Sequence, residues 1–103
     1  MRSSLAAVLT VLGAATVQAQ DLPISLEITG SEGARVTGTC VLMHSDGSER
    51  IMLDQAVPVS LTREGTSFSC KIEAKGRVAI AAKRGSSKSN SKLNNGVATF
   101  RVE

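Results

Sequence analysis

Apolar and polar residues alternate one by one through most of the chain after residue 20. In the run from Pro23 to Thr29, Ile24, Leu26 and Ile28 fall on one face and polar residues fall mainly on the other. Because successive side chains of a strand point to opposite faces, this run predicts a strand with one buried face. No stretch after residue 20 shows the period of about 3.6 residues that is typical of an amphipathic helix.

Comparable alternating runs recur about every ten residues, with turn signals between them. Their apolar faces centre on residues 36–42, 51–53, 57–61, 68–72, 78–82 and 98–102. The turn signals lie at residues 30–33, 44–48, 63–65, 74–76 and 94–96. Asn95-Gly96 in the last of these predicts a two-residue hairpin. The whole pattern predicts an all-β fold, a small antiparallel sandwich of about seven strands. A small closed β-barrel is the alternative, because both folds show the same alternation.

Two segments depart from this pattern. Pro58 lacks a backbone N–H, so the run 57–61 is predicted to be an edge strand. The segment from Arg84 to Lys92 contains four serines and no large apolar residue. That composition favours a mobile loop, and a polar edge strand is the alternative.

Residues 1–19 have the organisation of a cleavable signal peptide. Arg2 supplies the positive charge, and a short apolar stretch follows. Val17 and Ala19 are the small residues that precede a cleavage site. The apolar stretch is shorter than the roughly 20 residues needed to cross a bilayer. We therefore expect residues 20–103 to form a single domain that is secreted or periplasmic, with no transmembrane segment after signal removal.

Cys40 and Cys70 are the two cysteines of the chain. An even number of cysteines in an exported protein favours a disulfide. Both residues fall on the apolar faces of their predicted strands, which suggests a bridge that joins two sheets through the core. The chain lacks the cysteine spacings of redox and metal motifs and has one histidine, His44, so no metal site or cofactor is expected.

Charge is distributed unevenly along the chain. Residues 21–70 contain seven acidic and three basic residues, whereas residues 71–103 contain eight basic and two acidic residues. A cluster of cations attracts anions and speeds their encounter. The basic residues that we consider candidates for contact with an anion are Lys75, Arg77, Lys83, Arg84, Lys88 and Lys92.

Catalytic chemistry finds little support in the sequence. Ser89 and Lys92 match the spacing of serine–lysine nucleophiles, but that chemistry needs a helical turn in a dry pocket, and the segment is polar. His44 lies in a predicted turn with no nucleophile paired to it. We therefore expect no catalytic residue and no enzyme.

The partner is expected to be an anionic surface or polyanion, or another extracytoplasmic protein. Nucleic acid is disfavoured, because single-strand binders stack bases on aromatic side chains and this chain has two Phe and no Trp or Tyr. The sequence thus predicts a non-catalytic binding module with a basic C-terminal half. The alternative is an accessory or inhibitor-type domain that contacts another protein through edge strands or loops.

Overall fold

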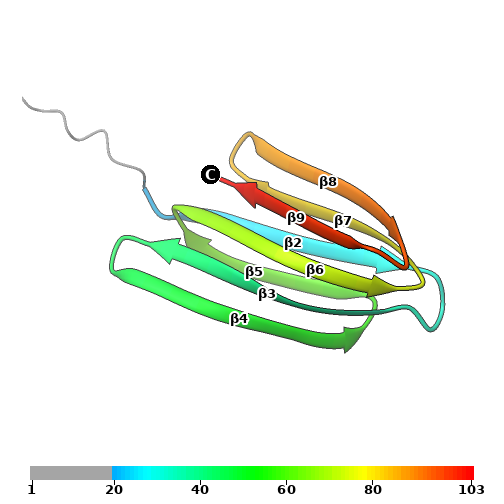
Figure 1. Cartoon of the computed structure of the whole chain (residues 1–103). Helices are drawn as coiled ribbons and strands as arrows, with labels where there is room; N and C mark the ends of the chain where they lie inside the picture. Colours follow the sequence, from blue (N-terminus) through cyan, green and yellow to red (C-terminus); the bar gives the residue numbers. More distant parts are fainter. Residues whose placement is uncertain (1–19) are drawn as a thin grey trace, which may run out of the picture.

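A computed structural model describes residues 20–103, and the predicted signal peptide at 1–19 lies outside the described residues. The described part forms eight strands. Their bounds are β2 Leu22–Gly30, β3 Arg35–His44, β4 Gly47–Ala56, β5 Val59–Gly65, β6 Ser67–Lys75, β7 Arg77–Arg84, β8 Ser87–Asn94 and β9 Val97–Val102. They make two four-stranded antiparallel sheets, ordered β5-β2-β7-β8 and β4-β3-β6-β9 (Figure 1). The sheets do not close into a barrel, so the predicted sandwich is confirmed.

The hydrophobic core lies between the two sheets and is built from the alternating inward positions of their strands. In β2, for example, Ile24, Leu26 and Ile28 are each no more than 2% exposed. Both phenylalanines, Phe68 and Phe100, are also buried there. The period of two in the sequence is therefore the direct cause of the fold, because it gives each strand one face to bury.

The connections between strands are short. Ser45-Asp46 joins β3 to β4 and Gly85-Ser86 joins β7 to β8, in each case as a two-residue hairpin within one sheet. The other connections pass from one sheet to the other. Among the described residues there is no helix, and therefore none that could cross a membrane.

The hairpin predicted at Asn95-Gly96 is wrong, because β8 and β9 belong to different sheets. Asn95 does adopt the positive φ, 56°, that such a turn uses. Its hydrogen bonds, however, run to the turn between β6 and β7. The Gly76 N–H donates to Asn95 Oδ1 at 2.8 Å, and the Asn95 N–H donates to the Gly76 carbonyl at 3.1 Å. The turn thus carries the chain across the sandwich instead of pairing the two strands that flank it.

The Cys40–Cys70 disulfide is present, but its expected placement between the sheets is wrong. Cys40 and Cys70 are directly opposite each other on β3 and β6, two neighbouring strands of one sheet, with Cα atoms 4.0 Å apart. Both side chains face the core and are almost fully buried. Alternation indicates which face a residue occupies but not which strand lies beside it, so inward-facing cysteines are compatible with either placement.

The segment expected to be a mobile loop is instead mostly strand β8, which pairs with β7 along its whole length. The polar edge strand that we kept as the alternative is therefore correct. At this edge of the sandwich Ser87, Ser89 and Ser91 are half-buried, and Leu93 packs against the core. Small serines therefore occupy three of the inward positions of β8, at the rim of the core.

The strand predicted around Pro58 is confirmed as an edge strand, because β5 pairs with β2 alone. Pro58 itself lies just before β5, in the connection from β4. Its missing N–H therefore removes no hydrogen bond from the sheet.

Gly38 allows β3 and β6 to approach each other closely. A Cβ at this position would overlap the Lys71 carbonyl oxygen and lie 2.9 Å from the Ile72 Cα. Because these are backbone atoms in a paired strand, Gly38→Ala should destabilise the fold by roughly 1–3 kcal/mol, as overpacked cores do. Urea denaturation would measure the change. Gly96→Ala is the control, since the nearest atom to its added Cβ is Leu93 Cδ2 at 3.8 Å. Equal stabilities of the two variants would contradict the close approach.

Asp21 fastens the start of the described chain to the β3–β4 hairpin. The Ser45 hydroxyl and backbone N–H donate to its carboxylate at 2.7 and 3.0 Å, and these hydrogen bonds lower the pKa of Asp21 below its ordinary value of 3.8. A lowered folded-state pKa means that the contact stabilises the fold above the unfolded-state pKa and is lost as the pH falls through the folded-state value.

Asp21→Ala should therefore be less stable than the wild-type protein at neutral pH, and the difference should shrink once the pH falls below 3.8. Thermal denaturation across that range would measure it. Ser45→Ala should show the same pH dependence, because it removes the hydroxyl donor. A stability difference that stays constant with pH would contradict the contact.

Candidate functional site

Strands β7 and β8 place cations on the outer face of their sheet. The outward positions of β7 alternate with the buried Val78, Ile80 and Ala82. Those of β8 alternate with half-buried residues at the rim. The outward residues of the two strands are Arg77, Ala79, Ala81, Lys83, Lys88, Asn90, Lys92 and Asn94. We call Arg77, Lys83, Lys88 and Lys92 the basic face.

The register of β7 and β8 brings the four cations into two pairs. Lys83 lies directly opposite Lys88. Lys92 lies opposite Ala79 and is thus the diagonal neighbour of Arg77. Opposite residues have Cβ atoms about 5 Å apart, and diagonal neighbours are about 7–8 Å apart, within reach of long side chains. Residues far apart in the sequence, such as Arg77 and Lys92, are therefore brought together by strand pairing alone.

Within residues 20–103 no ion pair joins the basic face to a carboxylate. Glu27 of β2 lies opposite Ala81 and is a diagonal neighbour of Lys83, but its carboxylate accepts a hydrogen bond from Ser60 on the other side, in β5. Within residues 20–103 the ion pairs are Arg35–Asp54 and Arg101–Glu103, and both lie on the other sheet. Like charges placed directly opposite each other in a sheet are destabilising, so the Lys83–Lys88 pair is unfavourable for the domain by itself. An anion bound between the two lysines would relieve this repulsion.

Two of the six candidate residues lie apart from the basic face. Lys75, on β6, is exposed on the outer side of the other sheet. Arg84, at the end of β7, is only partly exposed, because its guanidinium group donates to backbone carbonyls. Its Nε–H donates to the Gly65 carbonyl at 2.9 Å, and an Nη–H donates to the Gln20 carbonyl. Arg84 thus joins β7 to the end of β5 and to the start of the described chain.

Arg84→Ser should lower the free energy of unfolding by about 1–2 kcal/mol, because it removes hydrogen bonds from a charged donor. Lys83 is next to Arg84 in β7, but its side chain points to the opposite face of the sheet. Lys83→Ser should therefore change stability by no more than about 0.5 kcal/mol. Chemical denaturation of the two variants would compare them. Equal stabilities would show that Arg84 has no structural role.

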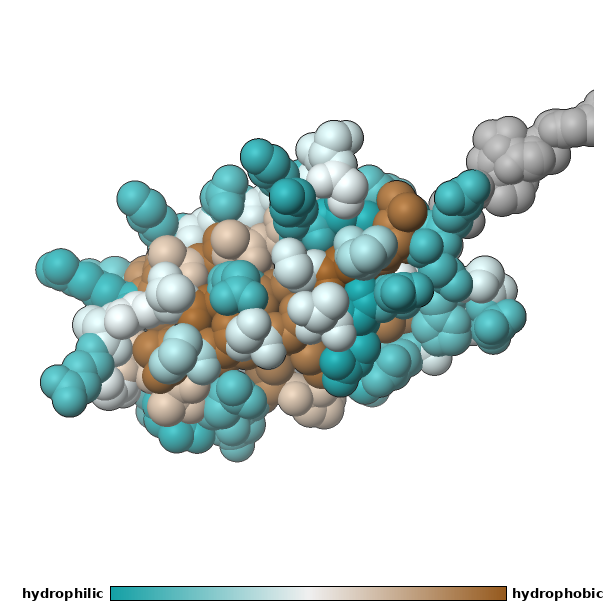
Figure 2. Space-filling model, turned by 180° about the vertical axis from the view of Figure 1, so that it is seen from behind, coloured by the Kyte–Doolittle hydropathy of each residue, from teal (hydrophilic) through white to brown (hydrophobic). Residues whose placement is uncertain are grey.

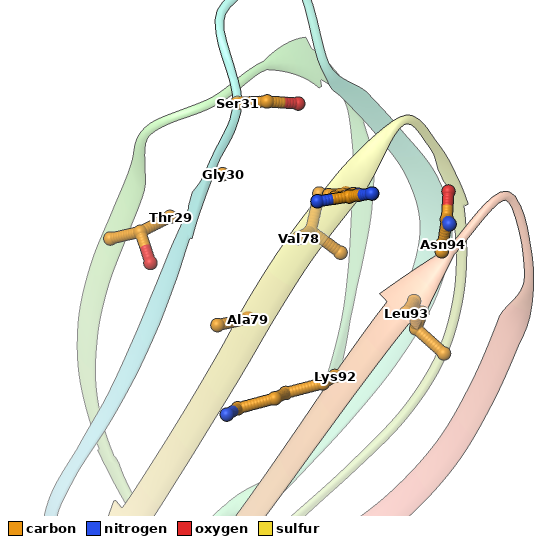
Figure 3. A pocket seen from close by; sticks show the side chains of 9 residues that line it. Thr29, Gly30, Ser31, Val78, Ala79, Lys92, Leu93 and Asn94 are labelled. Atoms are coloured by element: carbon orange, nitrogen blue, oxygen red, sulfur yellow. The ribbon is translucent and has the colours of Figure 1, made fainter.

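A shallow hollow of about 470 Å³ adjoins the Arg77–Lys92 pair. Its lining residues come from β2, β7 and β8 and from Ser31, which follows β2. Thr29, Ser31 and Asn94 contribute polar side chains (Figure 3). In Figure 3 the Lys92 side chain extends from β8 toward β7, below Ala79. The sequence did not single out Thr29, Ser31 or Asn94. They come from segments that are distant in the chain, and only the β2–β7–β8 pairing places them at one hollow.

The residues considered for catalysis are not arranged for it. Ser89 and Lys92 are three residues apart on a strand, so Ser89 faces the rim of the core and Lys92 faces outward. His44 is half-buried at the end of β3, beside the hairpin to β4. No group of three or more histidine, cysteine or acidic side chains suited to a metal ion occurs in the described part of the chain. Comparison of the chain with protein-family models, curated proteins and solved structures found no match to any of them.

Proposed function

We propose that this domain is a non-catalytic binding module of an exported protein and that its basic face contacts an anionic partner. The observation that carries the proposal is the grouping of Arg77, Lys83, Lys88 and Lys92 on two paired strands, where none of the four forms an ion pair with a carboxylate of residues 20–103. The repulsion between Lys83 and Lys88 adds to it, because a fold selected for stability alone would place opposite charges there.

The disulfide supports the exported location in this proposal. Disulfides persist in secreted and periplasmic proteins and are rare in the reducing cytosol. Cys40 and Cys70 are both almost fully buried in the core, so the bond is part of the packed fold. Together with the signal-like residues 1–19, it is compatible with a partner outside the cytoplasm.

A salt titration tests the proposal against the alternative of an accessory domain that adds an edge strand to another protein. Binding to a heparin-coated surface should weaken markedly between low and moderate ionic strength, because exposed charges are screened over about 10 Å at 0.1 M salt. Strand addition rests on backbone hydrogen bonds and should respond little to salt. Absence of binding to both heparin-coated and anionic-lipid surfaces at low ionic strength would refute the proposal.

A further inference from the structure

On the outer face of the β5-β2-β7-β8 sheet, basic and acidic residues lie on different strands. The basic face occupies β7 and β8. The β5–β2 half instead presents Glu27, which accepts a hydrogen bond from the Ser60 hydroxyl at 2.6 Å, and Glu64 at the outer edge. The basic face therefore forms a narrow strip, because it covers only β7 and β8 and neighbouring strands lie about 4.8 Å apart. A partner that covered the whole face would bring its own anions against these carboxylates.

The two pairs of cations are separated along this strip. Lys92 on β8 lies opposite Ala79 on β7, and Ala79 is four residues from Lys83 along β7. At about 3.3 Å per residue, this places the Lys83–Lys88 pair roughly 13 Å from Lys92. Between the pairs the outward side chains are small, and Asn90 opposite Ala81 is the largest of them. A single small anion cannot reach both pairs, whereas an elongated polyanion lying along the strands can.

The side chains around the basic face make a lipid bilayer a poor match for the anionic partner. Figure 2, seen from behind relative to Figure 1, shows pale small residues and a hydrophobic band framed by projecting hydrophilic side chains. The large exposed hydrophobic residues, Met43, Met52 and Val97, belong to the outer face of the other sheet. A bilayer contact through the basic face would therefore have no large apolar side chain to insert, and its plane would meet Glu27 and Glu64.

Nucleic acid is also a poor match for this strip. Both phenylalanines are buried in the core, so no aromatic side chain is available on the face for base stacking. A polysaccharide does not require stacking when ionic contacts supply the affinity. Asn90 on the strip and Thr29 and Ser31 at the hollow offer hydrogen bonds to sugar hydroxyls. Arg77 offers the forked donor geometry that suits a carboxylate or sulfate.

From these features we infer that the anionic partner is a linear acidic polysaccharide, which lies along β7 and β8 and bridges the Lys83–Lys88 and Arg77–Lys92 pairs. The inference rests on the proposed function and names the chemical class of its partner. Its carboxylate or sulfate groups contact the two pairs, and its sugar hydroxyls face Asn90 and the hollow. Simultaneous contact at two sites makes affinity depend on the length of the polymer.

The test compares probes of different class and length against the purified protein. Labelled heparin dodecasaccharide should bind roughly tenfold or more tightly than the labelled disaccharide, because only the longer probe can bridge both pairs. Lys83→Ser/Lys88→Ser and Arg77→Ser/Lys92→Ser should each reduce that advantage to about twofold or less. Oligogalacturonate of equal length distinguishes a carboxylate requirement from a sulfate requirement, and binding of either polymer supports the inference. Thermal denaturation confirms that each variant is folded.

Two further probes separate failure of the inference from failure of the proposed function. If phosphatidylglycerol vesicles or an oligothymidylate bind more tightly than both polysaccharides, and the two double variants lose that binding, the proposed function stands and the polysaccharide inference is wrong. Equal affinities for the disaccharide and the dodecasaccharide also overturn the bridged geometry. If no probe binds at low ionic strength, both proposals are wrong.

Discussion

Replacing Cys40 and Cys70 together by alanine should lower the free energy of unfolding by about 2–5 kcal/mol, as the loss of a native disulfide does in small exported domains. The bond connects residues 30 positions apart, so it restricts the unfolded chain substantially. The side chains also fill space in the core, since Cys40 and Cys70 are 0% and 3% exposed. Small domains have about 5–15 kcal/mol of stability in total, so this loss is a large share. Urea denaturation monitored by circular dichroism would measure it.

The position of the bridge adds a second expectation. Because it joins neighbouring strands of one sheet, the two sheets are held together by apolar packing and by the chain connections, not by the disulfide. Reduction of the wild-type protein should therefore lower stability by an amount similar to the double alanine variant while leaving the unfolding transition cooperative. A wild-type stability that does not change with reductant would contradict a bonded, structural pair.

Replacing Lys83, Lys88 and Lys92 together by serine should weaken binding to an acidic polysaccharide by roughly threefold to a hundredfold. Exposed ion pairs are worth about 0.2–1 kcal/mol each, so three of them account for about 0.6–3 kcal/mol, and each 1.4 kcal/mol is about tenfold in affinity. The variant should fold at least as well as the wild-type protein, because it removes the repulsion between Lys83 and Lys88. Anisotropy of a labelled oligosaccharide at low ionic strength would measure the affinity.

The matched control removes the same charge from the opposite sheet. Arg50, Lys71 and Lys75 are exposed on the outer face of the β4-β3-β6-β9 sheet and take no part in the ion pairs of residues 20–103. Their triple serine variant should lose only about twofold to threefold, through the reduced net charge. An equal loss in both triple variants would mean that net charge, not the basic face, determines binding.

Much of the fold could be predicted because it depends on local alternation. The inward faces of β2, β6 and β7 follow directly from apolar residues at every second position. The turn signals at residues 30–33, 44–48, 74–76 and 94–96 each include a connection between strands, whereas the turn predicted at 63–65 is wrong, because these residues end strand β5 and the chain turns at Thr66. Pairing between strands was not predictable in the same way. Alternation predicted that Cys40 and Cys70 face the core. It did not predict that β3 and β6 are neighbours in one sheet, because that pairing depends on which connections cross between the sheets. Asn95-Gly96 likewise predicted a turn without showing that the turn changes sheet.

The candidate site shows the same division. Composition indicated a basic C-terminal half, and the predicted apolar face of residues 78–82 leaves Arg77 and Lys83 on the opposite, outward positions of the same strand. Alternation could not separate Arg84, whose role depends on the distant carbonyl of Gly65. It also could not place Lys88 opposite Lys83, because the serine-rich segment resembled a loop until its pairing with β7 was known. Edge strands with few apolar residues take their structure from the neighbouring strand more than from their own sequence.

We place the contact with the anionic partner on the outer face of β7 and β8. The most direct measurement is a titration of isotope-labelled protein with heparin dodecasaccharide, followed by backbone amide chemical shifts in nuclear magnetic resonance spectra. We predict that the largest shifts fall between Arg77 and Asn94, on β7 and β8, and disappear at high ionic strength. Largest shifts on the other sheet, β4-β3-β6-β9, or shifts that persist at high ionic strength, would contradict this placement.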